Sequence, residues 1–289
     1  MRGMAEARRL RFAYDTNGLA HHRLEDALDL LADAGYDGVG LTLDVHHLDP
    51  FRSTAAAVRR VRKQMEKRGL ACVVETGARY LLHPSRKHWP TLLSTDPGDA
   101  AVRREFLLRA VSIAADLGAA VVSTWSGAAD PGTGREENLA RLAAGLEAVC
   151  DRAGTEGVAV GFEPEPGMFV GDLAGWRELR GRFPHPRLGL TLDVGHVLCE
   201  PGGDPAAAVT AHGAEIISIQ VEDMKRGVHE HLPFGKGDLD LVAVVKAILN
   251  SSYDGLAVVE LSRDSHRAAE AVRESLAALR TAAGAATGG

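Results

Sequence analysis

Short apolar runs and amphipathic stretches alternate along the whole of this chain. The apolar runs are rich in β-branched residues and have the length of buried strands. They occupy residues 10–14, 38–43, 71–75, 119–125, 158–162, 188–192, 215–221 and 256–260. Between them apolar residues recur at helical spacing, first at Leu24, Leu28 and Leu31 and then within 54–68, 99–117 and 136–153. Eight strands that alternate with about eight helices predict a single (β/α)8 TIM barrel.

Helix boundaries are also marked in the sequence. We expect four helices to end at a glycine, the residue favoured in the left-handed position after a helix: Gly35, Gly69, Gly118 and Gly157. We expect three later helices to begin after an acidic residue that caps their first turn: Asp172, Asp204 and Asp238.

The competing architecture is a doubly wound open sheet. That fold usually has a glycine-rich phosphate turn after its first strand, and here the corresponding segment, YDTNGLAHHRL, has no GxGxxG pattern. We therefore predict one barrel domain over residues 1–282 and a flexible Ala/Gly tail over 283–289. The longest stretch without a helix pattern, residues 79–98, is either a substrate-covering loop or a solvated surface loop. Its candidate contact residues are His83, Arg86, Lys87 and His88.

Four polar side chains close predicted strands in the second half of the chain: Glu163, Asp193, Gln220 and Glu260. Functional sites of parallel α/β folds lie at the carboxyl ends of the strands, so these side chains are expected to meet in one cup. Oxygen-rich sites suit Mn²⁺, Mg²⁺ or Co²⁺ better than Zn²⁺. Considered alone, each of these four residues is explained equally well as a helix cap or a solvated strand end as by a role in a shared site.

Composition narrows the class of partner. The 289 residues carry a net charge of −6, without the clustered Lys and Arg that phosphate contacts need. No apolar run reaches membrane-spanning length, and the first residues lack the apolar core of a secretory signal. We therefore expect a cytoplasmic protein with a small-molecule substrate, without nucleic acid or membrane as partner, and a homo-oligomer remains open. Cys72 and Cys150 are expected to be packing residues.

The segments FEPEPG, LTLDVGHVL, IQVEDMKRG, FGKGDLD and VVEL carry a resemblance. Together with the barrel pattern they resemble the xylose-isomerase-like TIM-barrel superfamily, in particular its sugar (phosphate) isomerase and epimerase group. That group includes ketose 3-epimerases, hydroxypyruvate isomerase and inosose dehydratase. The resemblance implies a divalent metal held by Glu163, Asp193, position 220 and Glu260.

Position 220 departs from the family pattern, which has histidine there in a His-x-x-Asp motif whose acid corresponds to Asp223. A glutamine offers only a neutral carbonyl oxygen, so the metal would be bound more loosely in an all-oxygen site. Two later histidines, His229 and His231, either replace the missing nitrogen, contact substrate or lie in a solvated loop. By the same resemblance, His196 and Arg226 hold substrate oxygens.

Further residues can line the cup. Trp125 ends the fourth strand and either stacks on a sugar face or walls the pocket. Glu165 competes with Glu163 for the ligand role, although Glu163 directly closes its strand. The ends of the first three strands carry acids that line the cup or form salt bridges at its rim: Asp15, Asp44 and Glu75.

The resemblance implies proton transfer on a sugar or polyol through an enediolate, with Glu163 and Glu260 as the paired acid and base. The function predicted is therefore a divalent-metal-dependent isomerase or epimerase. A lyase or dehydratase on a cyclic polyol or keto-glycoside would use the same site. A catalytically silent barrel with a binding role is a further alternative, supported by Gln220. A phosphodiesterase of the apurinic-endonuclease type is disfavoured by the acidic net charge.

Overall fold

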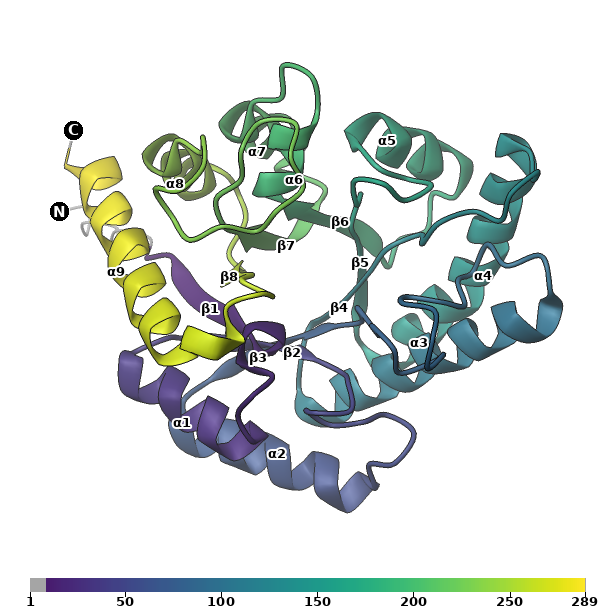
Figure 1. Cartoon of the computed structure of the whole chain (residues 1–289), viewed down its shortest axis with the longest axis horizontal. Coiled ribbons are helices and arrows are strands. Elements are labelled where there is room, and N and C mark those ends of the chain that lie inside the picture. The colour runs from purple at the N-terminus through teal and green to yellow at the C-terminus, as the bar shows by residue number, and fades with distance from the viewer. Residues whose placement is uncertain (1–8, 289) are drawn as a thin grey trace, which may run out of the picture.

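A closed barrel of eight parallel strands in sequential order forms the centre of the computed structural model, which describes residues 9–288 (Figure 1). The predicted TIM barrel is therefore confirmed, and the open sheet is excluded. The strands are β1 (Arg11–Asp15), β2 (Gly38–Thr42), β3 (Ala71–Glu75), β4 (Val121–Thr124), β5 (Ala159–Phe162), β6 (Leu188–Asp193), β7 (Ile216–Val221) and β8 (Leu256–Val259).

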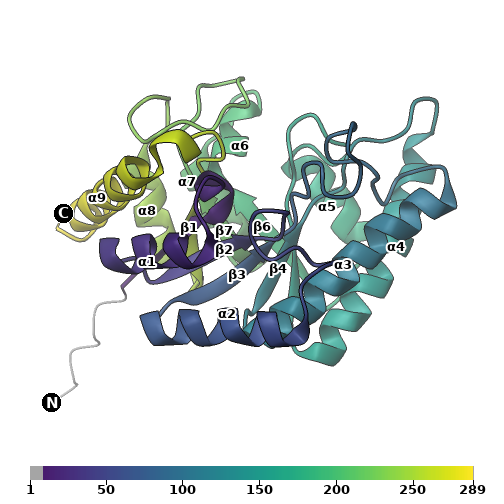
Figure 2. The same cartoon turned by 60° about the horizontal axis from the view of Figure 1, so that its bottom comes forward.

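Helices surround the barrel, and Figure 2 shows α2, α3 and α4 on the outside of the strands. They are α1 (Leu24–Ala34), α2 (Ala55–Arg68), α3 (Pro97–Leu117), α4 (Arg135–Glu156), α5 (Leu173–Arg182), α6 (Val194–Cys199), α7 (Pro205–His212), α8 (Leu241–Asn250) and α9 (Ala268–Thr287). Short 3-10 helices, η1 (Thr16–Leu19) and η2 (Ser265–Arg267), follow β1 and β8. The short α6, directly after β6, was not predicted.

Most of the predicted helix boundaries are confirmed. All four glycines follow their helices in the left-handed conformation, with φ between 68° at Gly69 and 92° at Gly35. Asp172 and Asp204 cap α5 and α7 as expected, each accepting a backbone N–H in the first turn.

The predicted cap at Asp238 was wrong, because α8 begins at Leu241 and its cap is Asp240, which accepts from Ala243 N at 3.0 Å. The Asp238 side chain instead accepts from Arg226 N at 2.9 Å, so it fixes the preceding loop.

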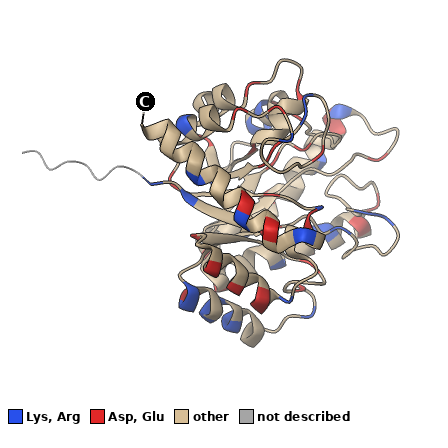
Figure 3. Cartoon of the chain, turned by 60° about the vertical axis from the view of Figure 1, so that its left-hand side comes forward, with Lys and Arg blue, Asp and Glu red and all other residues tan. Residues whose placement is uncertain are grey.

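The C-terminal segment 283–289, expected to be a tail, is helical as far as Thr287 because α9 continues through it. Residues 1–8, part of the predicted barrel domain, and Gly289 lie outside the described residues. Within residues 9–288 no helix has both the length and the apolar character needed to cross a membrane. In the view of Figure 3, acidic and basic residues are interspersed along the outer helices.

Side chains alternate along each strand between two cores. Outward-facing residues pack against the helices, as where the ring of Phe162 stacks on Trp176 of α5 with centroids 6.0 Å apart. Inward-facing residues form a smaller cluster made of Ala13, Val73, Val121, Leu256 and Val258. The inward positions of β5 include Gly161, where a Cβ would lie 2.2 Å from Thr191 Oγ1. Glycine and apolar residues up to the size of leucine therefore fill the lower barrel, and the next inward position on each strand lies at its carboxyl end.

Gly161→Ala is predicted to destabilise the protein by about 1–3 kcal/mol, because the added methyl group overpacks the barrel interior. A urea unfolding curve measures the change. Gly181→Ala in α5 is the matched control, since no atom lies within 4 Å of the position its Cβ would take. This control should be neutral or more stable by up to about 1 kcal/mol. Equal stability of the two variants would show that the barrel interior has room beside Thr191.

Candidate active site

Polar side chains occupy the last inward position of most strands, so the carboxyl end of the barrel is a polar cup. A cavity of about 510 Å³ opens there. Its lining includes one side chain from each of six strand ends: Asp15, Thr42, Glu75, Glu163, Gln220 and Glu260. Asp193 does not line the cavity itself but pairs in register with Gln220 across β6 and β7. The four predicted strand ends thus lie at the same mouth.

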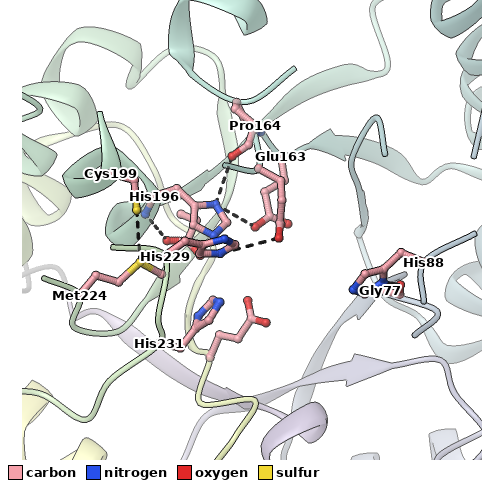
Figure 4. Close-up of polar contacts among 12 residues, drawn as sticks. Gly77, His88, Glu163, Pro164, His196, Cys199, Met224, His229 and His231 are labelled. Atoms are coloured by element: carbon pink, nitrogen blue, oxygen red, sulfur yellow. Dashed lines mark hydrogen bonds and ion pairs between the residues drawn. The ribbon is translucent and has the colours of Figure 1, made fainter. Parts of the chain in front are cut away.

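Asp193 is the point where the buried polar groups meet. Its Oδ1 caps α6 by accepting from His196 N at 2.9 Å, and its Oδ2 has no hydrogen-bond partner. The same Oδ2 lies 3.4 Å from His196 Nε2. His196 Nδ1 lies 3.1 Å from the Pro164 carbonyl and 3.5 Å from Glu163 Oε1 (Figure 4). One ligand-type atom each from Glu163, Asp193 and His196 lies within 4.8 Å of the others.

His229 and His231 belong to the same cluster. Figure 4 shows both rings directed towards His196 from the loop after β7. The ring centroids of His196 and His229 are 4.7 Å apart, and those of His229 and His231 are 5.4 Å apart. His229 Nε2 lies 3.7 Å from Glu165 Oε1. Three imidazoles therefore stand beside the carboxylates, so nitrogen donors lie close to the site that was expected to be all-oxygen.

Glu222 is a site residue that the sequence reasoning missed. It is fully buried, neither carboxyl oxygen has a hydrogen-bond partner, and it forms a compact group with Asp193 and His231. Asp223, which corresponds to the acid of the family motif, instead anchors the following loop. Its carboxylate accepts from the backbone N–H groups of Gly235, Gly237 and Leu239 at 2.8, 2.9 and 3.0 Å. The sequence did carry a signal for Glu222. Residues two apart share one face of a strand, so Glu222 is expected on the same face as Gln220.

Two other predicted residues are not brought to the cavity. The Arg226 guanidinium donates to the Gly203 carbonyl at 2.8 Å and is absent from the cavity lining. Asp44 accepts from Val45 N at 2.7 Å outside the cavity, and Thr42 is the residue that β2 contributes. Trp125 does line the cavity, with its ring edge-on to His88 at a centroid distance of 5.2 Å.

The loop between β3 and α3 covers part of the opposite side of the cavity. Of its candidate residues Lys87 and His88 line the cavity, whereas His83 and Arg86 do not. His88 Nδ1 lies 2.7 Å from the Gly77 carbonyl, across the opening from the histidine cluster in Figure 4. The buried Arg103 of α3 fixes this loop by donating to the carbonyls of His88 and Pro90, both at 2.8 Å.

Burial dominates the electrostatics of the cup. It raises the pKa of Asp15 and of Glu165 to about 8, with the charge of Glu260 as a second cause for both. Burial also holds the pKa values of Glu75, Glu163 and Glu222 well above the ordinary carboxyl range. The pKa of His196 falls to about 4 because burial disfavours the imidazolium. Burial raises the pKa of Asp193, but His196, a hydrogen bond with the Glu222 carboxyl group and His231 together outweigh burial, so this pKa is lowered.

The unpartnered buried atoms fit a divalent cation. Asp193 Oδ2, His196 Nε2, Gln220 Oε1 and both Glu222 oxygens have no hydrogen-bond partner. Leaving such groups buried and unpaired is costly, and a cation would satisfy several of them together. Mixed carboxylate and imidazole donors suit Mn²⁺, Co²⁺, Fe²⁺ and Zn²⁺. Glu260 belongs to none of the compact ligand groups found within residues 9–288, and its Oε1 accepts from Asn17 Nδ2 at 2.8 Å.

Comparison with known proteins agrees with the fold. Residues 28–282 match the family model of the xylose isomerase-like TIM barrel. The chain is 24% identical over 240 residues to L-ribulose-5-phosphate 3-epimerase of Salmonella paratyphi A, covering 82% of this chain and 81% of that protein. This protein therefore belongs to the xylose isomerase-like TIM-barrel family.

Solved structures of two epimerases have the same fold. D-allulose 3-epimerase from Methylomonas sp., in complex with D-allulose, superposes with a TM-score of 0.75 at 19% identity and covers 96% of this chain and 99% of its own. The 3-keto-D-glucoside 4-epimerase from E. coli superposes with a TM-score of 0.76 at 16% identity, covering 94% and 100% of the two chains.

Metal binding is predicted to counter a loss of stability between about pH 6.5 and 8. Asp15 and Glu165 keep their protons up to about pH 8 in the folded protein, whereas in the unfolded chain they lose them near the ordinary pKa values of 3.8 and 4.5. Histidines, whose ordinary pKa is 6.5, no longer oppose this trend above that pH. In EDTA the melting temperature should therefore fall between about pH 6.5 and 8. Saturating Mn²⁺ should raise it, and most at pH 8. Thermal scans of both samples decide this, and an unchanged curve with Mn²⁺ would argue against the ion site.

Gln220→His is predicted to tighten the binding of Co²⁺, Ni²⁺ or Zn²⁺ by about tenfold or more, because imidazole is a better donor than a carboxamide oxygen for these ions. Isothermal titration calorimetry of EDTA-stripped protein measures the change. Gln220→Asn, which keeps the carboxamide but shortens its reach, should not tighten binding. Equal affinity of Gln220→His and the wild type would place position 220 outside the ligand set.

Proposed function

We propose that this protein is a divalent-metal-dependent epimerase or isomerase that moves a proton at a carbon next to a carbonyl group of a sugar or polyol. The observation that carries the proposal is that Glu163 and Glu260 line one cavity from β5 and β8, beside a buried group of potential metal ligands. Two strands separate β5 from β8 in the closed barrel, so these carboxyl groups approach a bound substrate from different sides.

Each glutamate has a surrounding that suits proton transfer. Asn17 Nδ2 holds Glu260 Oε1 at 2.8 Å, which orients the carboxyl group and leaves Oε2 for the substrate proton. Glu163 Oε1 lies 3.5 Å from His196 Nδ1, and burial raises the pKa of Glu163. A base with a raised pKa accepts a proton from carbon more effectively near neutral pH. One glutamate removes the proton, and the other returns one to the opposite face or to the neighbouring carbon.

Asp193 and His196 are the best-placed residues to hold the metal with Glu163, because their unpartnered atoms are buried next to one another. A bound divalent ion would polarise the substrate carbonyl and stabilise the negative charge that develops on it. His196 was expected to hold substrate oxygens, yet it is buried behind the cavity lining. We therefore assign it to the ligands, and assign hydroxyl contacts to Lys87 and Arg79 at the mouth.

Trp125 supplies an apolar wall on which a sugar face can stack. Its position is fixed on two sides: His88 meets its ring edge-on, and the Arg103 guanidinium lies over the ring at 5.0 Å from its centroid. A pocket that combines one aromatic wall with many carboxyl oxygens suits a polyhydroxylated ligand. The relatives named above act on ketoses and a keto-glucoside according to their names, which supports the same substrate class.

Glu260→Gln is predicted to lower turnover by about 10²- to 10⁴-fold, because the substitution keeps the volume but removes the proton acceptor. The measurement is C–H exchange into a panel of ketoses and keto-glycosides in D₂O with Mn²⁺, followed by NMR. Glu147→Gln, the same change at an exposed position of α4, is the control and should exchange like the wild type. Loss of a hydroxyl group without exchange in recovered substrate would favour a lyase instead. Wild-type exchange in Glu260→Gln would remove Glu260 from the acid–base pair.

A further inference from the structure

Residue 220, where the family has a histidine, is a glutamine in this chain, and the buried Glu222 lies close to it. Gln220 offers only a carboxamide oxygen, whereas Glu222 adds a buried carboxyl group with two unpartnered oxygens. We propose that Glu222 and His231 bind the divalent ion together with Asp193, in place of an imidazole at position 220. This inference rests on the metal dependence in the proposed function and extends the ligand set.

The three side chains already form a compact group. One ligand-type atom from each of Asp193, Glu222 and His231 lies within 4.8 Å of the others. His231 Nδ1 lies 4.0 Å from Glu222 Oε2, too far for a hydrogen bond but suitable for two ligands of one ion. Asp193 Oδ2, His231 Nδ1 and both Glu222 oxygens have no hydrogen-bond partner.

The backbone explains why Glu222 and His231 meet. Strand alternation places Glu222 on the inward face that Gln220 occupies, one step nearer the mouth. The loop after β7 then returns beside its own start, where Asp223 and Leu232 form an antiparallel bridge with N–O distances of 3.0 and 2.8 Å. Residues 222 and 231 each precede a member of this bridge, and both side chains are directed to the side of Asp193.

The fold leaves space for the Glu222 carboxyl group. Gly195 lies in the first turn of α6, and a Cβ there would be 2.1 Å from Glu222 Oε1. Any other residue at position 195 would displace this carboxyl group or Met224, which also lies within 3 Å of that Cβ position. The φ angle of Gly195 is not in the left-handed region, so its backbone conformation does not require glycine. Glycine is required at this position because the Glu222 carboxyl group occupies the space of a Cβ.

A purely structural role does not account for Glu222. The neighbouring Asp223 shows what a structural carboxylate has here, because three backbone N–H groups donate to it. Glu222 has no backbone donor of this kind, and its carboxyl group faces that of Asp193, so in the absence of a cation the two can be held together only by sharing a proton. Two carboxylates and one imidazole form a mixed set of oxygen and nitrogen ligands, which binds first-row divalent ions firmly.

The test is isothermal titration calorimetry of EDTA-stripped full-length protein with Mn²⁺ and with Co²⁺. Glu222→Gln and His231→Gln should each weaken binding by at least about tenfold, since even groups that only support a ligand contribute about 10- to 100-fold. Two matched controls should bind like the wild type. Glu230→Gln makes the same change one residue from His231, in a side chain that pairs with Arg263, and His21→Gln changes an exposed imidazole.

Thermal unfolding separates a ligand from a structural residue. In EDTA, Glu222→Gln should melt at or above the wild-type temperature, because an unpartnered buried carboxyl group has been removed. With Mn²⁺ it should lose most of the rise in melting temperature that the wild type shows. Wild-type affinity in folded Glu222→Gln and His231→Gln, or a lower melting temperature in EDTA with an unchanged Mn²⁺ response, overturns the inference alone. If the wild type binds neither ion at millimolar concentration, the metal dependence of the proposed function fails with it.

Discussion

Crowding of carboxyl groups at one end of the barrel is the constraint on which the rest of the site depends. Asp15, Glu75, Glu163, Asp193 and Glu222 are all buried there, and the basic side chains that line the cavity stand at its mouth. A protein selected for stability alone would not keep this arrangement, because each buried carboxyl group must be protonated, paired or bound to a cation. The buried carboxyl groups of the cup therefore lower the stability of the protein below what the same fold would have with apolar residues there, as is usual for functional sites.

The barrel produces this crowding through the two-residue period of its strands. Glycine and apolar residues, among them Gly161 and Ala13, fill the interior below the cup, so the next inward position on the same strand reaches the mouth. Closure then brings the ends of all eight strands around one cavity, regardless of their distance in the sequence. The helices only have to hold the strands in register, and their apolar faces do so through the outer core.

This regularity is why the barrel and much of the site were predictable from the sequence. Glu163, Gln220 and Glu260 could be assigned because each follows an apolar run at a fixed place, and all line the cavity. The incorrect predictions concern residues beyond the strand ends, where the conformation of a loop and not the strand periodicity determines the direction of a side chain. Arg226 lies in a loop whose hydrogen bonds to Gly203 and Asp238 turn it away, and no periodic pattern encodes that turn. The burial of His196 behind the lining follows from the unpredicted helix α6.

The loop after β7 shows how closely structural and chemical roles can adjoin. Asp223 directs its carboxylate away from the cavity and ties down the backbone of residues 235–239, whereas the preceding residue directs its carboxylate inward. Because the same anchored loop carries His229 and His231, the hydrogen bonds of Asp223 position the imidazoles that approach Asp193. In the proposed ligand set, this loop supplies from another direction the nitrogen donor that glutamine at position 220 does not provide. The identity of residue 220 and the conformation of this loop should consequently vary together among relatives of this fold.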